Sequence, residues 1–163
     1  MTLHYGIIIV MNTEVSGESD MKLLGAKLGA LLKGGEIIEL IGDVGAGKTT
    51  LTKGIASGMQ IDEDVQSPSF TISRVYDAPD NLRLAHYDFY RLHDAGIMGD
   101  ELHETLHDPS TVTIIEWAEI IAGILPSDHV TITINNTAHD EHARQVTIKA
   151  GGEKSAALIG KLA

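Results

Sequence analysis

Residues 42–50 read Gly-Asp-Val-Gly-Ala-Gly-Lys-Thr-Thr, and this stretch decides the expected fold. It satisfies the pattern Gly-x4-Gly-Lys-Thr through Gly42, Gly47, Lys48 and Thr49. Glycines in such a loop allow positive φ and let backbone N–H groups approach phosphate oxygens closely. The lysine can reach the β and γ phosphates of a nucleotide, and the threonine hydroxyl can take one position on Mg²⁺. The stretch therefore predicts a loop that binds the phosphates of ATP.

The segments on either side of this loop fit the same chemistry. Residues 36–41 read as a strand that enters the loop, and residues 48–57 fit a helix that leaves it. A helix beginning at Lys48 places its partial positive charge beneath the bound anion. A glycine-rich turn with a chance lysine is the alternative, but the strand-to-helix context favours nucleotide binding. The expected contacts to the nucleotide are Asp43, Gly45, Ala46, Gly47, Lys48, Thr49 and Thr50.

The rest of the chain alternates between strand and helix patterns. A first helix fits residues 18–33, where apolar residues recur at spacings of three and four, and a short helix is expected from about Glu153. Strands are expected at residues 6–11, 70–76, 82–88, 111–115, 130–135 and 144–149, the last two forming an antiparallel pair around a polar loop. This order predicts an α/β fold, a P-loop NTPase three-layer sandwich with a mixed β-sheet.

Composition limits the classes of partner. The 163 residues suit one domain spanning 1–163, and the net charge of −11 opposes direct binding of a phosphate backbone. We therefore expect any contact with nucleic acid to be made through a partner protein. There are no cysteines, no apolar run reaches the ~20 residues of a membrane span, and no secretory signal is recognisable. These features indicate a cytoplasmic protein without a membrane contact.

Two acids are candidates for holding Mg²⁺ and the attacking water. Glu116 directly follows the apolar strand 111–115, and Asp88 ends the strand 82–88. Both should emerge at the carboxyl edge of the sheet, where open α/β folds bind ligands. We assign Thr49 and Glu116 as direct metal ligands. Asp88 is expected to contact the metal's ligands without binding the metal itself, or to position the attacking water. The expected catalytic residues are Lys48, Asp88 and Glu116.

Four segments together extend the interpretation to a family. They are Gly42–Thr50, Ser67-Pro-Ser-Phe70, His86-Tyr-Asp-Phe-Tyr-Arg-Leu92 and Ile115-Glu-Trp-Ala-Glu119. From about Glu18 to Arg144 the chain resembles the TsaE (YjeE) family, bacterial P-loop ATPases required for the tRNA modification N6-threonylcarbamoyladenosine (t6A37). The second, third and fourth segments carry the resemblance beyond P-loop proteins in general.

The resemblance implies a role for each segment. Asp88 and Glu116 fall on the two functional acids of the family, and Trp117 on a tryptophan beside the nucleotide. Ser67–Thr71 would be a segment that senses the γ phosphate. ATP with Mg²⁺ would be bound and slowly hydrolysed to drive or reset a complex of the TsaD and TsaB subunits. Met21 departs from the threonine that many members carry, so no adenine contact is assigned there.

Other functions compete with this interpretation. A small-molecule or nucleotide kinase would also combine this loop with an α/β core, but such kinases surround the phosphoryl group with several arginines and this chain has four. A GTPase is disfavoured, because no Asn-Lys-x-Asp segment for guanine occurs. A third alternative, a protein that binds ATP without hydrolysing it, remains open. Because no arginine finger is evident, we expect weak hydrolysis that partners stimulate. His103-Glu-Thr-Leu-His107 matches a zinc-protease pattern, but Pro109 should end its helix, which favours coincidence.

Overall fold

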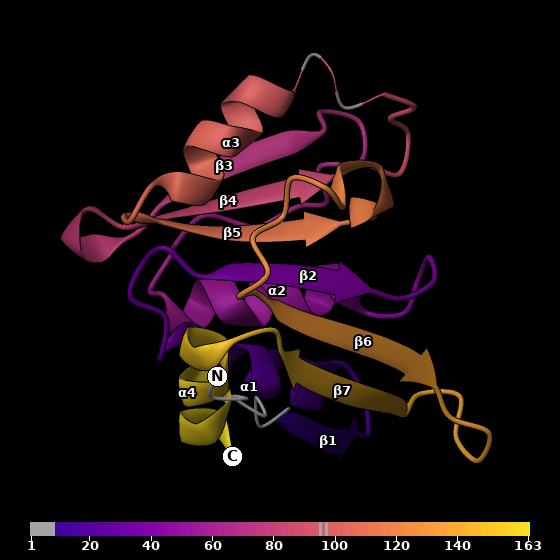
Figure 1. The fold of residues 1–163 in the computed structure, drawn as a ribbon. Helices are drawn as coiled ribbons and strands as arrows, with labels where there is room; N and C mark the ends of the chain where they lie inside the picture. The colour runs from indigo at the N-terminus through magenta and orange to yellow at the C-terminus, as the bar shows by residue number, and fades with distance from the viewer. Residues whose placement is uncertain (1–8, 95, 97) are drawn as a thin grey trace, which may run out of the picture.

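A seven-stranded mixed sheet with helices on both faces forms the body of the molecule (Figure 1). The computed structural model describes residues 9–94, 96 and 98–163. The strands lie in the order β1-β7-β6-β2-β5-β4-β3. Their bounds are β1 Val10–Val15, β2 Ile37–Ile41, β3 Ser73–Asp77, β4 Arg83–Asp88, β5 Thr111–Glu116, β6 Val130–Asn136 and β7 Arg144–Ala150.

The centre of the sheet is parallel and its two margins are antiparallel. Strand β2 lies between β5 and β6 and runs parallel to both, and β4 runs parallel to β5. Strands β3, β7 and β1 join by antiparallel pairing. The four parallel strands therefore end at one edge, where β2 leads into the glycine loop and β4 and β5 end in Asp88 and Glu116. The expected mixed sheet is confirmed.

Alternation along the strands divides the core into two layers. Ile38 and Leu40 of β2 face a large apolar cluster shared with α1 (Glu18–Gly29), α2 (Lys48–Gly58) and α4 (Glu153–Leu162). Ile37 faces a smaller cluster on the opposite side, with α3 (Gly99–His107) and the short 3-10 helix η2 (Ala118–Ile121). In Figure 1, α3 lies at the β3–β4–β5 end of the sheet. The predicted three-layer arrangement is confirmed.

Helices α1 and α2 meet backbone to backbone. A Cβ atom built on Gly25 of α1 would lie 2.5 Å from the carbonyl oxygen of Leu51 in α2. A Cβ on Gly54 of α2 would lie 2.4 Å from the carbonyl oxygen of Lys22 in α1. Only glycine permits this separation, because its backbone carries no side chain. The helix that carries the glycine loop is thus fixed directly against α1.

Several predicted elements differ from the structure. The first helix ends at Gly29 instead of residue 33, and β3 begins at Ser73 instead of residue 70 because Ile72 has φ 69°. The expected buried strand at 6–11 is only partly testable, since residues 6–8 lie outside the described residues. Strand β1 begins at Val10, which is 45% exposed because β1 is an edge strand. Helix α3 was not predicted as an element, because only Leu102 and Leu106 mark its buried face.

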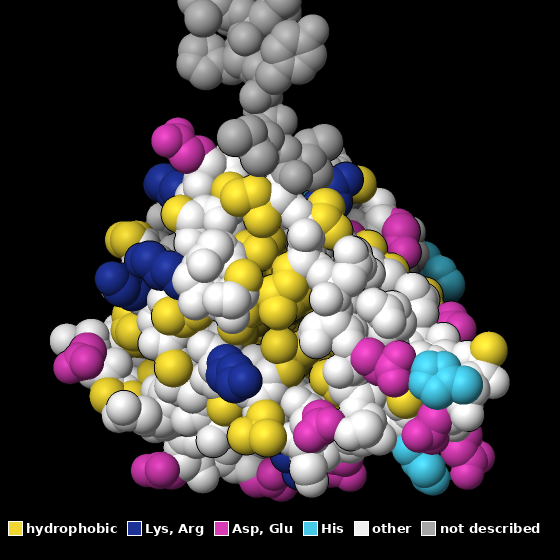
Figure 2. All heavy atoms as spheres, turned by 90° about the horizontal axis from the view of Figure 1, so that it is seen from below, with side chains coloured by type: hydrophobic (Ala, Val, Ile, Leu, Met, Phe, Trp, Pro, Cys, Tyr) yellow, Lys and Arg dark blue, Asp and Glu magenta, His cyan; other side chains and the backbone are white. Residues whose placement is uncertain are grey.

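The face that carries β1, α1 and α4 combines apolar and charged groups. Viewed from below Figure 1, apolar side chains show through a furrow in the middle of this face, and most basic side chains stand apart from one another (Figure 2). A dispersed arrangement of lysine and arginine does not resemble the clustered basic surface that nucleic-acid binding requires. Within the described part of the chain, no helix is both long and apolar enough to cross a membrane.

Candidate functional site

The glycine loop joins β2 to α2 with the positive φ angles that its glycines predict. Gly45 has φ 82° and Gly47 has φ 113°, both in the region that side chains disfavour. Gly47 is the N-cap of α2 and has no side chain to occupy the N–H groups of the first helical turn. Those N–H groups have no acceptor within the helix, and no acidic residue lies in that turn. The end of α2 is therefore arranged to receive an anion.

The Lys48 ammonium lies at the mouth of this loop. It donates hydrogen bonds to the carbonyl oxygens of Gly42 (2.5 Å) and Asp43 (2.9 Å). The residue is only 7% exposed, and its Nζ atom lies 5.2 Å from the centre of the Trp117 ring. A buried ammonium whose neighbours are neutral carbonyls and an aromatic face carries a charge that an anion can neutralise.

The two predicted acids lie together on the α2 side of the sheet. Asp88 and Glu116 are register partners on the parallel strands β4 and β5 and are 4% and 3% exposed. Both therefore reach the carboxyl edge as expected. Each already has partners within the protein: His86 Nε2 lies 2.9 Å from one Glu116 oxygen, and Asp88 accepts bonds from the Ser69 hydroxyl and the Tyr90 N–H, both at 3.0 Å.

The protein itself supplies partners to both buried carboxylates. His86 supplies a partner to Glu116 from the same face of β4, two residues before Asp88. Sequence reasoning missed it because the two residues are 30 positions apart and meet only through the pairing of β4 with β5.

A hollow of about 430 Å³ brings the predicted residues together. Its lining includes Lys48, Thr49, Asp88, Glu116, Ser69 and Trp117. Within the described residues, Glu116 Oε1 is bonded to His86, whereas Oε2 and the Thr49 hydroxyl carry no hydrogen bond. Carboxylate and hydroxyl oxygens are hard donors that suit Mg²⁺, which takes few protein ligands and completes its shell with phosphates and water. The donor set therefore fits the predicted metal.

A second hollow, of about 460 Å³, opens on the other side of the same loop. It is lined by Gly45, Ala46, Gly47 and Thr50 of the loop region, by residues 16–18 and Met21 at the start of α1, and by His142 and Arg144. Arg144 donates from Nε to the Ala46 carbonyl at 3.2 Å and from Nη1 to two carbonyls of its own loop. The sequence did not single out Arg144, because it lies 98 residues from Ala46.

Comparison with known proteins decides the family. A family model described as "Threonylcarbamoyl adenosine biosynthesis protein TsaE" matches residues 15–146. The chain belongs to the TsaE family.

The relatives agree over most of the chain. The tRNA threonylcarbamoyladenosine biosynthesis protein TsaE of Bacillus subtilis is 38% identical over 144 residues, covering 88% of this chain and 87% of that protein. Its counterpart in Streptomyces coelicolor is 37% identical over 140 residues, covering 82% and 93%. The crystal structure of Bacillus subtilis YdiB aligns with a TM-score of 0.79 at 30% identity, covering 96% of this chain and 95% of that one. These findings confirm the TsaE resemblance and the P-loop NTPase type of fold.

The remaining segments of the TsaE resemblance lie around the first hollow. Trp117 adopts left-handed backbone angles (φ 57°, ψ 52°) directly after Glu116, and its ring lies 4.9 Å from that of Tyr90. A left-handed backbone conformation at a residue other than glycine costs about 1–3 kcal/mol and persists only where packing enforces it. Ser69 of the predicted sensing segment bonds to Asp88, which links that segment to an acid of the site.

An arginine also lines this hollow. The guanidinium carbon of Arg91 lies 4.6 Å from the centre of the Phe70 ring, and Phe70 is 84% exposed. No arginine finger was evident from the sequence, and the structure places Arg91 on the rim of the hollow, engaged with an aromatic ring. Its guanidinium belongs to the outer surface and not to the buried group around Lys48.

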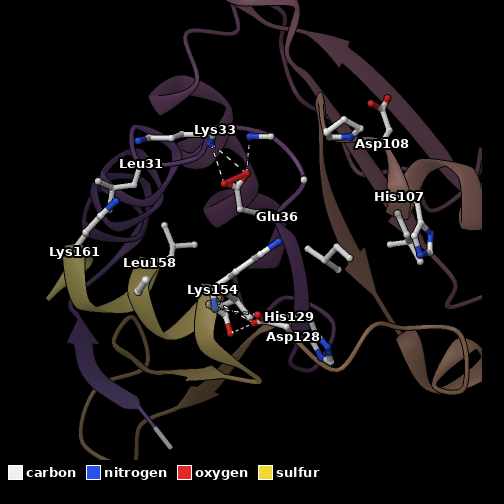
Figure 3. Close-up of a pocket in the computed structure, with 18 residues that line it drawn as sticks. Leu31, Lys33, Glu36, His107, Asp108, Asp128, His129, Lys154, Leu158 and Lys161 are labelled. Carbon is white, nitrogen blue, oxygen red and sulfur yellow. Dashed lines mark hydrogen bonds between the residues drawn. The ribbon is translucent and has the colours of Figure 1, made fainter. Parts of the chain in front are cut away.

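A third hollow, at the amino end of β2, has different chemistry (Figure 3). It measures about 420 Å³, and its carboxylates are already used by the backbone. Glu36 accepts from the N–H groups of Lys33 and Gly34, and Asp128 accepts from those of Lys154 and Ser155. Burial opposes ionisation of Asp128, but the Ser155 hydroxyl and the two N–H groups outweigh it, so the pKa of Asp128 is lowered. These acids hold turns and helix ends in place.

The zinc-protease pattern has a structural explanation. Helix α3 ends at His107, as Pro109 predicted, and both histidines are exposed. Their ring centroids lie 4.3 Å apart with the planes tilted by 38°, and His107 Nδ1 lies 2.8 Å from the His103 carbonyl oxygen. Across residues 9–94, 96 and 98–163, no group of three or more His, Cys, Asp or Glu side chains is placed to hold a metal ion.

Proposed function

We propose that this chain is a Mg²⁺-dependent ATPase of tRNA N6-threonylcarbamoyladenosine biosynthesis, with residues 1–163 acting as one cytoplasmic domain. The observation that supports this most strongly is the meeting of Lys48, Thr49, Asp88 and Glu116 at one hollow, in a chain of the TsaE family. The related proteins are named for this tRNA modification.

Different groups of this chain act on the phosphates, the metal ion and the attacking water. The Lys48 ammonium and the N–H groups at the start of α2 neutralise the β and γ phosphates. The Thr49 hydroxyl and Glu116 hold Mg²⁺, which supplies positive charge at the phosphates when bound. Asp88, fixed by Ser69 and Tyr90, orients the attacking water. The bond from Ser69 to Asp88 couples the segment Ser67–Thr71 to the phosphate site.

The surroundings of the site suit control by a partner. Three exposed apolar side chains line the hollow: Val44 at 76%, Phe70 at 84% and Tyr90 at 55%. A partner that covers them buries apolar surface and reaches the γ phosphate at the same time. We assign this role to the TsaD and TsaB subunits, with tRNA contacted through them. The net charge of −11 suits a basic surface on the partner, and association between opposite charges should weaken as salt rises.

The positions of the four arginines give little support to a kinase function. Arg74 and Arg83 are exposed on β3 and β4, and Arg83 is paired with Asp108. Arg144 holds the loop from the opposite side, and Arg91 stacks on Phe70. Kinases that transfer phosphoryl groups surround them with positive charge, and these four side chains do not form such an arrangement.

Reconstitution tests the proposal. The protein is combined with TsaB, TsaD, tRNA, ATP and the other substrates of the modification, and threonylcarbamoyladenosine per TsaD is measured over time. We expect repeated turnover with the wild-type chain and none beyond background with Lys48→Ala. Equal turnover with both variants would contradict the proposal. A phosphorylated small molecule as product would replace it with the kinase function.

A further inference from the structure

His86 is the most completely buried ionisable side chain near the hollow. It is 0% exposed, and its Nε2 atom lies 2.9 Å from Glu116 Oε1. It belongs to the face of β4 that also carries Asp88, and its register partner on β5 is Ile114, two residues before Glu116. The imidazole thus lies on the same face of the sheet as the two carboxylates, two residues before them along the strands.

The surroundings of the two ring nitrogens of His86 differ. Its Nδ1 atom is buried and has no hydrogen-bond partner within the described residues. A tautomer with its only proton on Nδ1 would leave that N–H without an acceptor and would turn a lone pair toward Glu116, which is unfavourable. A proton on Nε2, 2.9 Å from Glu116 Oε1, is donated to that oxygen. His86 is therefore a hydrogen-bond donor to Glu116.

The two acids of the site differ in how many of their carboxylate oxygens are bonded within the protein. Both oxygens of Asp88 accept hydrogen bonds within the protein, from Tyr90 N–H and the Ser69 hydroxyl. Glu116 has one oxygen held by His86, while Oε2 carries no hydrogen bond within the described part of the chain. A carboxylate with one oxygen fixed and one available is the form in which second partners orient metal ligands in proteins.

We infer that His86 is a positioning residue that fixes the Glu116 side chain so that Oε2 is the oxygen presented to Mg²⁺. The inference rests on the proposed function, because it gives a role to the metal site of that function. It also explains why Glu116 and not Asp88 should bind the metal directly. Loss of such a partner typically lowers metal affinity about 10–100-fold.

Three variants separate this role from a purely structural one. His86→Leu removes the donor, His86→Gln keeps an amide N–H that can reach Glu116, and Glu116→Gln removes the acceptor charge. ATP affinity is measured by calorimetry with Mg²⁺ and with EDTA, and the Mg²⁺ concentration for half-maximal effect is determined for each. Circular dichroism confirms that each variant is folded.

We expect His86→Leu to raise the half-maximal Mg²⁺ concentration at least tenfold while ATP affinity in EDTA changes less than twofold. His86→Gln should recover most of the loss, and His86→Leu should add little in the Glu116→Gln background. A wild-type Mg²⁺ response in His86→Leu would overturn the inference, as would an equal loss in a folded His86→Gln. If the wild-type chain shows no Mg²⁺ effect on ATP binding at all, the proposed function fails instead.

A measurement on the wild-type chain keeps the test independent of variant folding. In ¹⁵N-edited NMR spectra, the His86 ring should carry a proton on Nε2, the nitrogen that faces Glu116. A proton on Nδ1 alone would overturn the inference.

Discussion

Replacing Gly25 by alanine should force α1 away from the helix that carries the glycine loop. The new Cβ would lie 2.5 Å from Leu51 O, 2.8 Å from Ile55 N and 2.9 Å from Gly54 Cα. Ordinary contacts between carbon and oxygen are about 3.3–3.6 Å, so the helices must separate by roughly 1 Å. All three atoms are backbone atoms, which no side-chain rotation can move.

The two opposing effects of this substitution can be compared. Overpacking a core contact costs about 1–3 kcal/mol, and a clash with backbone belongs at the upper end. Alanine in the middle of a helix recovers about 1 kcal/mol through its higher helix propensity. The net expectation is a loss of about 2 kcal/mol, which for a chain of this size lowers Tm by about 4–8 °C.

Urea unfolding followed by circular dichroism measures the loss. Gly160→Ala in α4 is the matched control, because no atom lies within 4 Å of its new Cβ. The control should be unchanged or slightly stabilised, so the two variants should differ by about 2–3 kcal/mol. Gly25→Ala should also weaken ATP binding, since α2 moves with its loop. Equal stability of the two variants would refute the backbone contact between α1 and α2.

Three further substitutions give smaller, distinct effects. Glu116→Ala should retain ATP binding in EDTA but lose its enhancement by Mg²⁺ in calorimetry; an intact Mg²⁺ effect would contradict the ligand assignment. Asp128→Asn should cost about 1 kcal/mol at pH 7, because it weakens the acceptor for the first N–H groups of α4. The folded pKa of Asp128 is lowered, so its contribution is present above the unfolded pKa of about 3.9 and disappears as pH falls through the folded value. Urea titrations of both proteins should therefore converge in acid, and a constant difference would be evidence against this role. Arg144→Met should weaken ATP binding about 2–10-fold, because the Ala46 carbonyl loses its hydrogen bond; an unchanged affinity would remove Arg144 from the site.

Local signals explain the parts of the fold that the sequence predicted well. The glycine loop, β2 and α2 follow from neighbouring residues: positive φ at Gly45 and Gly47, then a helix. Strands β4 and β5 were predicted to within one residue, because continuous or alternating apolar runs reflect burial directly. Their final acids could be placed at one edge because both strands run in the same direction as β2.

Long-range contacts explain what the sequence could not show. The partner of Glu116 depends on the register between β4 and β5, and nothing near Glu116 in the sequence indicates His86. Arg144 reaches Ala46 only because β7 returns beside β6, next to the loop. Phe70 was expected in a strand from its apolar character, but it is exposed at the rim of the hollow.

The central claim is that Lys48 and its loop bind ATP beside Trp117. Trp117 is the only tryptophan of the chain, and its ring lies 5.2 Å from Lys48 Nζ, so its fluorescence reports directly on this site. Titration with Mg²⁺ and ATP should give a saturable change in the wild-type chain. The same titration should give none in folded Lys48→Ala over the same concentrations. No change in the wild-type chain, or the same saturation curve in both proteins, would contradict the account.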